Sequence, residues 1–100
     1  MSKRFEYAYE RYYGELEDYF EGDLYAESIR EAALVLFAML KNFYAMTESE
    51  AIAMAEAILK QELGEDWTVE DLLGPDFQIW PDNSMAYRIQ AITETPQTQS

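Results

Sequence analysis

The chain is organised around the apolar stretch Ala32–Leu40, which reads Ala-Ala-Leu-Val-Leu-Phe-Ala-Met-Leu and carries no polar side chain. This run is far shorter than the roughly 18–20 apolar residues that a membrane-spanning helix needs. The helical pattern continues beyond both ends of the run. At about 100° per residue, one face of this helix consists of Ile29, Ala32, Leu36, Leu40 and Phe43. A helix that is apolar nearly all round is buried on several sides. We therefore expect a core helix against which the rest of the chain packs.

An amphipathic helix is expected ahead of the core helix, over Lys3–Phe20. Its core-facing stripe would consist of residues that fall within one arc of the helical wheel, namely Phe5, Tyr9, Tyr12, Tyr13, Leu16 and Phe20. Gly22 can end this helix in a left-handed conformation, and Asp23 can then cap the core helix. The core helix is expected to run from there to about Tyr44.

A third helix is marked by signals at both of its ends. Thr47 and Glu50 are spaced as a capping box, in which each side chain accepts a hydrogen bond from the backbone N–H of the other residue. Gly64 is suited to end the helix. The apolar stripe of this helix would consist of Ile52, Ala55, Ile58, Leu59 and Leu63.

After the third helix, the pattern changes to a short turn and two strands. Thr68 can cap one helical turn, Val69–Leu73, before a Gly-Pro pair ends it. Residues 77–80 and Met85–Ile92 favour strands, and the four residues between them have turn chemistry. The β-hairpin predicted from these strands would direct inward Phe77, Ile79, Tyr87, Ile89 and Ala91.

Together these elements predict an α+β fold with three main α-helices, a short helical turn and a C-terminal β-hairpin packed on the helices. A lone hairpin is only marginally stable in water, so it must dock on the helices. Residues 1–92 are expected to form a single globular domain. The polar, proline-containing segment 93–100 is expected to be a disordered tail.

Composition removes most of the usual catalytic groups. The chain has no histidine and no cysteine, which excludes Cys–His and Ser–His–Asp nucleophiles and thiolate metal sites. Two carboxylates could act as general acid and base, but among twenty acids many pairs are neighbours by chance. The acidic cluster Glu15–Asp23 lacks the alternating ligand spacing of a calcium-binding EF-hand loop. We therefore expect a non-enzymatic protein that uses no metal or cofactor.

Charge is the feature that bears on function. Twenty acids oppose seven bases, and the net charge is −13. This sign disfavours nucleic acid and anionic membranes as direct ligands, because both attract positive charge. The charge can serve solubility alone, since a high net charge keeps a protein in solution. It can also match a protein partner that has a basic surface.

The acids are concentrated in two segments that contain no base. The first, between Tyr12 and Ile29, holds Glu15, Glu17, Asp18, Glu21, Asp23 and Glu27. The second, between Gln61 and Tyr87, holds Glu62, Glu65, Asp66, Glu70, Asp71, Asp76 and Asp82. Like charges four residues apart destabilise a helix by a few tenths of a kcal/mol each, so the segments indicate a role other than local stability.

One such role is imitation of nucleic acid. Duplex DNA carries one charge per ~1.7 Å of its axis, and carboxylates four residues apart on a helix stand about 5–6 Å apart at their Cβ atoms. The pair Glu17 and Glu21 would have this spacing on the expected helix. Such a protein would occupy the basic channel of a nucleic-acid-handling enzyme and exclude the true ligand. The residues expected to bind the partner are Glu15, Glu17, Asp18, Glu21, Glu62, Glu65, Asp66, Glu70 and Asp71, with Tyr7 and Trp67 as exposed anchors.

In size, charge, mixed α/β layout and tyrosine content, the chain resembles small acidic DNA-mimic inhibitors carried by phages and plasmids. These include anti-restriction and anti-CRISPR proteins. The resemblance covers the whole chain and involves no residue motif, so it implies no particular site residue. It implies an inhibitor that occupies a nucleic-acid-binding surface of a host enzyme or defence complex.

Two other classes fit the same sequence. An immunity protein or chaperone that masks a cationic toxin or effector would also be small and acidic. An oligomeric adaptor would instead expose an apolar face of the core helix, such as Leu34–Ala38, and bury it by self-association. We expect a monomer or small homo-oligomer. We also expect a location in the cytoplasm (of a bacterial host cell if phage-encoded), because the chain lacks cysteine and its first residues lack a signal-peptide core.

Overall fold

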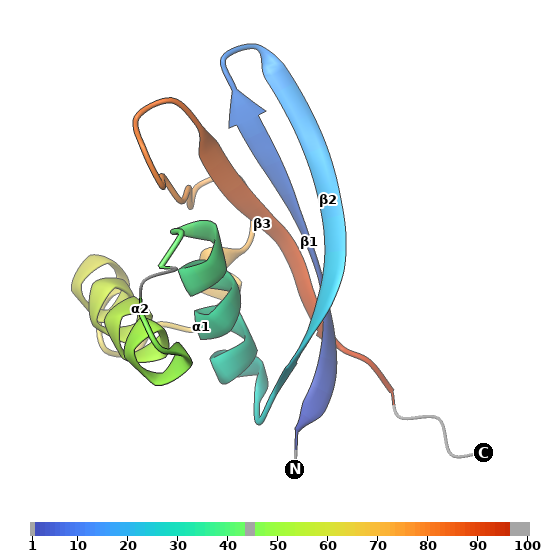
Figure 1. Ribbon diagram of the computed structural model, residues 1–100, viewed down its shortest axis with the longest axis vertical. Coiled ribbons are helices and arrows are strands. Elements are labelled where there is room, and N and C mark those ends of the chain that lie inside the picture. The colour runs from blue at the N-terminus through green and yellow to red at the C-terminus, as the bar shows by residue number, and fades with distance from the viewer. Residues whose placement is uncertain (1, 44–45, 97–100) are drawn as a thin grey trace.

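The fold is an antiparallel sheet in the order β2-β1-β3 with two helices on one face (Figure 1). The computed structural model describes residues 2–43 and 46–96. The elements are β1 (Lys3–Tyr13), β2 (Leu16–Ala26), α1 (Ile29–Leu40), α2 (Glu48–Leu63), the 3-10 helix η1 (Val69–Leu72) and β3 (Ala86–Glu94). The predicted class was wrong in its composition, because a three-stranded sheet and two helices replace the three helices and separate C-terminal hairpin.

The N-terminal segment is a long β-hairpin and not a helix. Phe5, Tyr7 and Tyr9 alternate with Glu6 and Ala8, which is the period of a half-buried strand, and aromatic residues favour strands. A two-residue loop that begins at Gly14, with φ of 61°, joins the strands. The two strands, of eleven residues each, then pair in continuous register.

Gly22 lies in the middle of β2, where the sequence predicted a helix end. It pairs with Tyr7 across the sheet, and a Cβ atom at Gly22 would lie 2.5 Å from Tyr7 Oη and 2.7 Å from Tyr7 Cζ. The tyrosine therefore covers the glycine, a known way of restoring packing at a strand glycine. The cap of α1 is Ser28 and not Asp23, because Ser28 Oγ accepts the Glu31 N–H at 3.1 Å.

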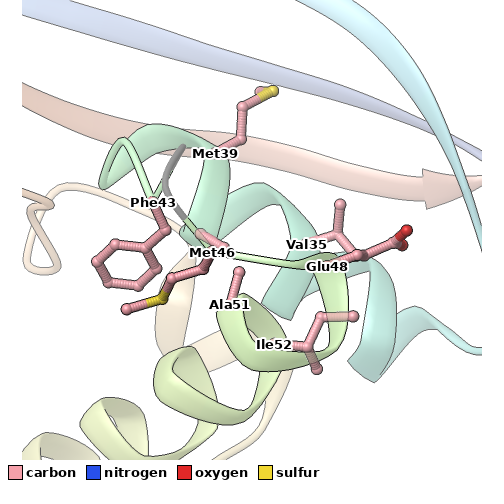
Figure 2. A pocket seen from close by; sticks show the side chains of 8 residues that line it. Val35, Met39, Phe43, Met46, Glu48, Ala51 and Ile52 are labelled. Carbon is pink, nitrogen blue, oxygen red and sulfur yellow. The ribbon is translucent and has the colours of Figure 1, made fainter.

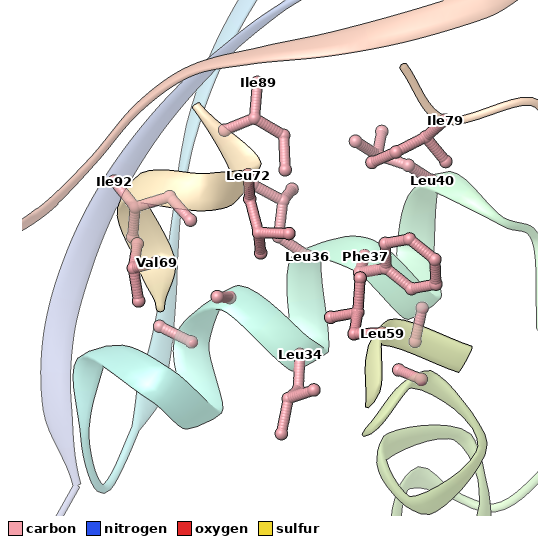
Figure 3. Packing of buried hydrophobic residues seen from close by; sticks show 14 of the residues in the cluster. Leu34, Leu36, Phe37, Leu40, Leu59, Val69, Leu72, Ile79, Ile89 and Ile92 are labelled. Atoms are coloured by element: carbon pink, nitrogen blue, oxygen red, sulfur yellow. The ribbon is translucent and has the colours of Figure 1, made fainter. Parts of the chain in front are cut away.

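Helix α1 is the core helix that the apolar run predicts. Its buried residues are Ala32, Ala33, Leu34, Leu36, Phe37, Ala38 and Leu40, and they pack between the sheet and α2 (Figure 3). Ile29 is 42% exposed and does not join them. The helix ends earlier than predicted because Asn42 adopts a left-handed φ of 63°, a common helix stop; Tyr44 lies outside the described residues.

Helix α2 begins and ends as predicted. The Glu50 N–H donates to Thr47 Oγ1 and the Thr47 N–H donates to Glu50 Oε1, both at 3.2 Å. Gly64 follows the last helical residue with φ of 100°. The turn predicted after Thr68 is also confirmed, as η1, and the Thr68 N–H donates to Asp71 Oδ2 at 2.8 Å. In the part of the chain described, no helix has both the length and the apolar character to cross a membrane.

Strand β3 pairs with β1, and residues 77–80 do not form the partner strand that was predicted. Within residues 77–80, Ile79 forms an isolated bridge with Tyr87 of β3, through two backbone hydrogen bonds of 2.8 Å. The predicted inward direction of Phe77 and Ile79 is confirmed, since both are buried and the Phe77 ring lies 6.3 Å from that of Phe37.

A register shift between Ala8 and Tyr9 changes which residues of β3 point inward. Ile89 and Ile92 are both buried, although they are three residues apart, because the extra residue of a bulge reverses the alternation of faces. Ala91, which was predicted to point inward, pairs with Ala8 on the opposite face. The predicted tail also begins too early, because β3 continues to Glu94; residues 97–100 lie outside the described residues.

Candidate functional site

The sheet has one face covered by the helices and one open face. Side chains of paired antiparallel residues lie on the same face, and Phe5 and Ile89 on the covered face have no exposed surface. The opposite face is turned away from α1 and α2 (Figure 1). On β1 and β2, this open face consists of Arg4, Glu6, Ala8, Glu10, Tyr12, Glu17, Tyr19, Glu21, Asp23 and Tyr25.

Half of the open face is an acid–tyrosine patch, made of Glu10, Tyr12, Glu17, Tyr19 and Glu21. Glu10 lies opposite Tyr19 and Tyr12 lies opposite Glu17, so carboxylates and phenols alternate across the two strands. Tyr19 is 58% exposed. Within residues 2–43 and 46–96, none of the three carboxylates forms an ion pair, although Glu10 accepts a hydrogen bond from the Gln90 amide. The patch therefore presents a net negative charge, although Arg88 of β3 pairs opposite Glu10 and its guanidinium lies 4.4 Å from the centre of the Tyr12 ring.

The negative charge of the patch also acts on its own tyrosines. Partial burial is the largest cause that raises the pKa of Tyr12 above 10.0, and a hydrogen bond to Glu10 and its charge add to the shift. The pKa of Tyr19 is raised first by desolvation, then by the charge of Glu21 and a hydrogen bond with it. Both phenols therefore stay protonated and serve as hydrogen-bond donors beside charged carboxylates.

The other half of the open face is partly neutralised. Arg4 forms a salt bridge of 2.9 Å with Asp23 and lies 4.0 Å from Glu6. Tyr25, which is 64% exposed, lies opposite Arg4. This half therefore offers aromatic surface with less net charge than the acid–tyrosine patch.

The first base-free segment is divided between the two faces of the sheet. Glu17 and Glu21 lie on the open face, whereas Asp18 lies on the other side and forms a 2.7 Å salt bridge with Arg11. Glu15 lies in the hairpin loop. The helical spacing expected for Glu17 and Glu21 was wrong, because residues four apart on a strand are separated by about 13 Å and not by 5–6 Å.

The second base-free segment belongs to the helical layer. Glu62 lies on α2, and Glu70 and Asp71 lie on η1. Glu65 and Asp66 lie between these two elements. All five side chains are exposed, but the sheet separates them from the open face, so the two segments do not form one row of charge.

The two residues expected as exposed aromatic anchors are not exposed in the structure. Trp67 is only 1% exposed, and Tyr7 is half-buried over Gly22 with its ring stacked on Tyr9 at 5.9 Å. On the open face of β1 and β2, Tyr19 and Tyr25 have more than half of their surface exposed. The alternation of acids and tyrosines at every second residue of β2 is the sequence signal that could have identified them.

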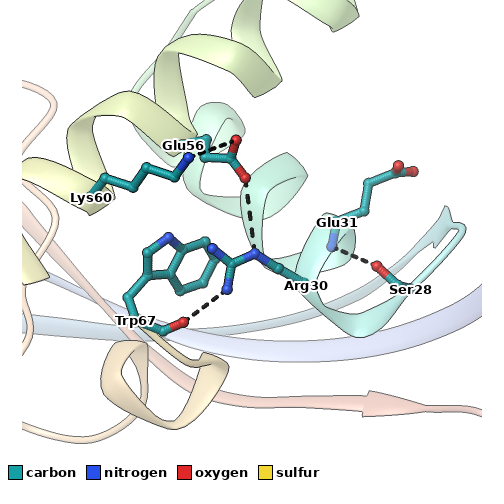
Figure 4. A network of polar contacts seen from close by, with 6 residues as sticks. All are labelled: Ser28, Arg30, Glu31, Glu56, Lys60 and Trp67. Atoms are coloured by element: carbon teal, nitrogen blue, oxygen red, sulfur yellow. Dashed lines mark hydrogen bonds and ion pairs between the residues drawn. The ribbon is translucent and has the colours of Figure 1, made fainter. Parts of the chain in front are cut away.

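Trp67 instead joins the helices to η1 (Figure 4). The Arg30 guanidinium lies 3.8 Å from the centre of the indole and donates to the Trp67 carbonyl at 2.8 Å. Arg30 also lies 3.9 Å from Glu56 of α2, which is paired with Lys60 at 3.6 Å. This cluster therefore has a structural role in the helical layer.

The helical layer also has an apolar groove of about 350 Å³ between the end of α1 and the start of α2 (Figure 2). Val35, Met39 and Ile52 line it, and its charged lining residue is Glu48. Leu34 and Ala38, part of the face that an oligomeric adaptor would expose, are buried within the chain itself. In the described ranges, no group of three or more acidic side chains is placed to hold a metal ion.

No protein-family model, curated protein or solved structure matches this chain. The chemistry of the surface is therefore the basis for an assignment of function. On the open face, carboxylates that form no ion pair with a described residue lie beside the exposed Tyr19 on two paired strands.

Proposed function

We propose that this protein is a non-enzymatic inhibitor that binds a basic, nucleic-acid-binding surface of another protein through the open face of its sheet. The observation that most supports this is the acid–tyrosine patch, in which Glu10, Glu17 and Glu21 form no ion pair with any residue that the structure describes and lie beside the exposed Tyr19. Tyrosine is favoured at protein interfaces, where it supplies rigid contact area.

The spacing of the patch suits rows of lysine and arginine. Side chains on one face of a strand are about 6.6–6.8 Å apart, and neighbouring strands are about 4.8 Å apart. Because one DNA strand carries a phosphate every 3.4 Å of axis, the patch is less dense in charge than a nucleic acid. It therefore imitates the position of some phosphates, while the phenol rings occupy the space between them.

The charge of the whole protein supports the same function. A net charge of −13 attracts a basic partner over a distance and accelerates association. It also repels nucleic acid, so the protein competes with the ligand of its partner without binding that ligand. The paired strands hold the patch in a fixed geometry, which lowers the entropic cost of binding.

The direct experiment is affinity capture from a bacterial lysate at about 50 mM and about 500 mM salt, a range over which charge-dependent binding weakens strongly. The proposal requires a nucleic-acid-handling protein that is retained at low salt, released at high salt and displaced by added duplex DNA. A small cationic partner that ignores DNA would instead indicate an immunity protein or chaperone. Capture of no partner under either condition would leave the charge as a solubility device.

A further inference from the structure

The outer edge of β2 is a second surface that can bind a protein. In the sheet order β2-β1-β3, strand β2 pairs with β1 on one side only, and no other strand of the described chain lies along its other side (Figure 1). The outer edge of β3 differs, because Ile79 bridges Tyr87 and the Gly74 N–H donates to the Ile89 carbonyl at 3.2 Å. Strand β2 is therefore the exposed edge of the sheet.

The hydrogen bonds of β1 show which groups of β2 face outward. The Arg4 carbonyl accepts the Thr95 N–H on the β3 side, and backbone groups alternate sides along an antiparallel strand. Phe5 therefore directs its backbone toward β2 and its partner, Leu24. By the same alternation, the residues of β2 whose N–H and C=O groups point to the free edge are Glu17, Tyr19, Glu21, Asp23 and Tyr25.

This edge has little of the protection that usually prevents strand pairing. Natural edges are blocked by proline, bulges, lysine or short length, whereas β2 is eleven residues long, contains no proline or lysine, and pairs with β1 without a bulge. Its protection is acidic charge. A second copy of β2 would bring acids against acids, which is unfavourable for like charges in opposite positions, but a basic strand would be attracted.

We infer that the outer edge of β2 binds an extended segment of the partner, rich in lysine or arginine, as a fourth strand of the sheet. This inference rests on the proposed function and adds the form of the bound segment. Basic side chains on one face of the added strand would meet Glu17 and Glu21. On its other face, apolar side chains would meet Phe20 and Leu24, which are only partly buried. The expected partner segment therefore alternates basic and apolar residues.

The test uses a labelled peptide of about nine residues that alternates lysine with valine, a usual strand length, and measures its binding by fluorescence anisotropy. A matched peptide of the same charge carries N-methyl groups on the backbone nitrogens that would face β2. We expect the N-methylated peptide to bind the wild-type protein at least about tenfold more weakly, because it cannot donate to the edge. Equal binding of the two peptides would overturn the inference.

Two variants of Tyr19 test the edge from the protein side. Tyr19→Pro removes an outward N–H without removing a hydrogen bond to β1, which is where an edge strand tolerates proline, and it leaves every charge in place. Tyr19→Thr removes the same ring but keeps the N–H. We expect Tyr19→Pro to bind the unmethylated peptide at least about tenfold more weakly than Tyr19→Thr, which lacks the same ring, with both folded by circular dichroism.

Two results would overturn the inference from this side. Equal binding by folded Tyr19→Pro and Tyr19→Thr would show that charge alone holds the peptide. A dimer of the free protein that disappears in Tyr19→Pro would show that a second copy occupies the edge. Failure of the proposed function would be visible separately, as a captured partner that DNA does not displace, because the peptide experiments contain no nucleic acid.

Discussion

At the scale of single residues, Tyr7 and Gly22 determine how the centre of the hairpin packs. Glycine inside a strand usually weakens it, so replacement by alanine would ordinarily be favourable. Here the new Cβ atom would lie 2.5 Å from Tyr7 Oη. Whether replacement of Gly22 by alanine stabilises or destabilises the protein therefore depends on the Tyr7 side chain.

We predict that Gly22→Ala lowers the free energy of unfolding by about 0.5–1.5 kcal/mol, because the Tyr7 phenol, the outer end of a half-buried side chain, must shift away from its rotamer. In a Tyr7→Ala background the clash is absent, so the same substitution is expected to be neutral or stabilising. Urea unfolding of the four proteins of this double-mutant cycle measures the difference. Equal destabilisation in both backgrounds would show that Tyr7 is not the cause.

A second residue-scale prediction concerns Tyr19 and Glu21. Glu21→Gln removes a negative charge, one of the causes that raise the pKa of Tyr19 above 10.0, so we expect that pKa to fall toward its ordinary value. Burial, the largest cause, remains. An NMR titration of the tyrosine ring measures the shift, and Glu62→Gln on α2 is the control that should leave it unchanged.

The same shift predicts a pH dependence of stability. A tyrosine whose pKa is raised on folding stabilises the protein below its unfolded pKa, and this contribution is lost as the pH rises through the folded pKa. Wild type is therefore expected to lose more stability than Glu21→Gln when the pH is raised above about 10, the ordinary pKa of tyrosine. An identical loss in the two proteins at alkaline pH would contradict the assignment.

At the scale of elements, Arg30 connects α1 to the Trp67 segment and to α2. We predict that Arg30→Lys lowers the free energy of unfolding by about 1–2 kcal/mol, because lysine cannot stack a planar group on the indole while donating to the carbonyl. Lys60→Met, which removes only the exposed ion pair with Glu56, should cost less than about 1 kcal/mol. Urea unfolding followed by tryptophan fluorescence measures both, and equal costs would contradict the stacking role.

The elements differ in how far the sequence could predict them. The start and end of α2 depend on Thr47, Glu50 and Gly64, whose signals act within a few residues, and both ends were predicted. The segment Lys3–Phe20 fits a helical stripe as well as an alternating strand because tyrosines occupy so many of its positions. Its strand form is set by pairing with β2 across the hairpin and with β3, which lies far away in the sequence, whereas the pattern within Lys3–Phe20 alone fits both forms.

The candidate site was only partly predictable for the same reason. The excess of acids between Tyr12 and Ile29 is visible in the sequence, and Glu17 and Glu21 do lie together on one surface. A strand sends neighbouring residues to opposite faces, so Asp18 was separated from them. The exposure expected of Trp67 was wrong: its neighbouring acids suggested an exposed ring, whereas the residue is 1% exposed and Arg30 covers its ring.

At the scale of the whole molecule, charge and architecture act together. The helices bury one face of the sheet and leave the other rigid and open, and most of the charge that lies on this open face is negative. A net charge of −13 favours encounter with any basic partner, but the fixed arrangement on β1 and β2 is what could select one. Binding is therefore expected to depend on where the acids lie and not only on their number.

The most direct test compares two double variants that change the net charge equally: Glu17→Lys with Glu21→Lys on the open face, and Glu62→Lys with Glu65→Lys in the helical layer. Affinity for the captured partner is measured for both at one salt concentration, with thermal unfolding as a check of folding. We predict at least about tenfold weaker binding for the open-face variant and a change within about threefold for the helical-layer variant. Equal weakening of the two would show instead that total charge governs binding and that the position of the acids does not.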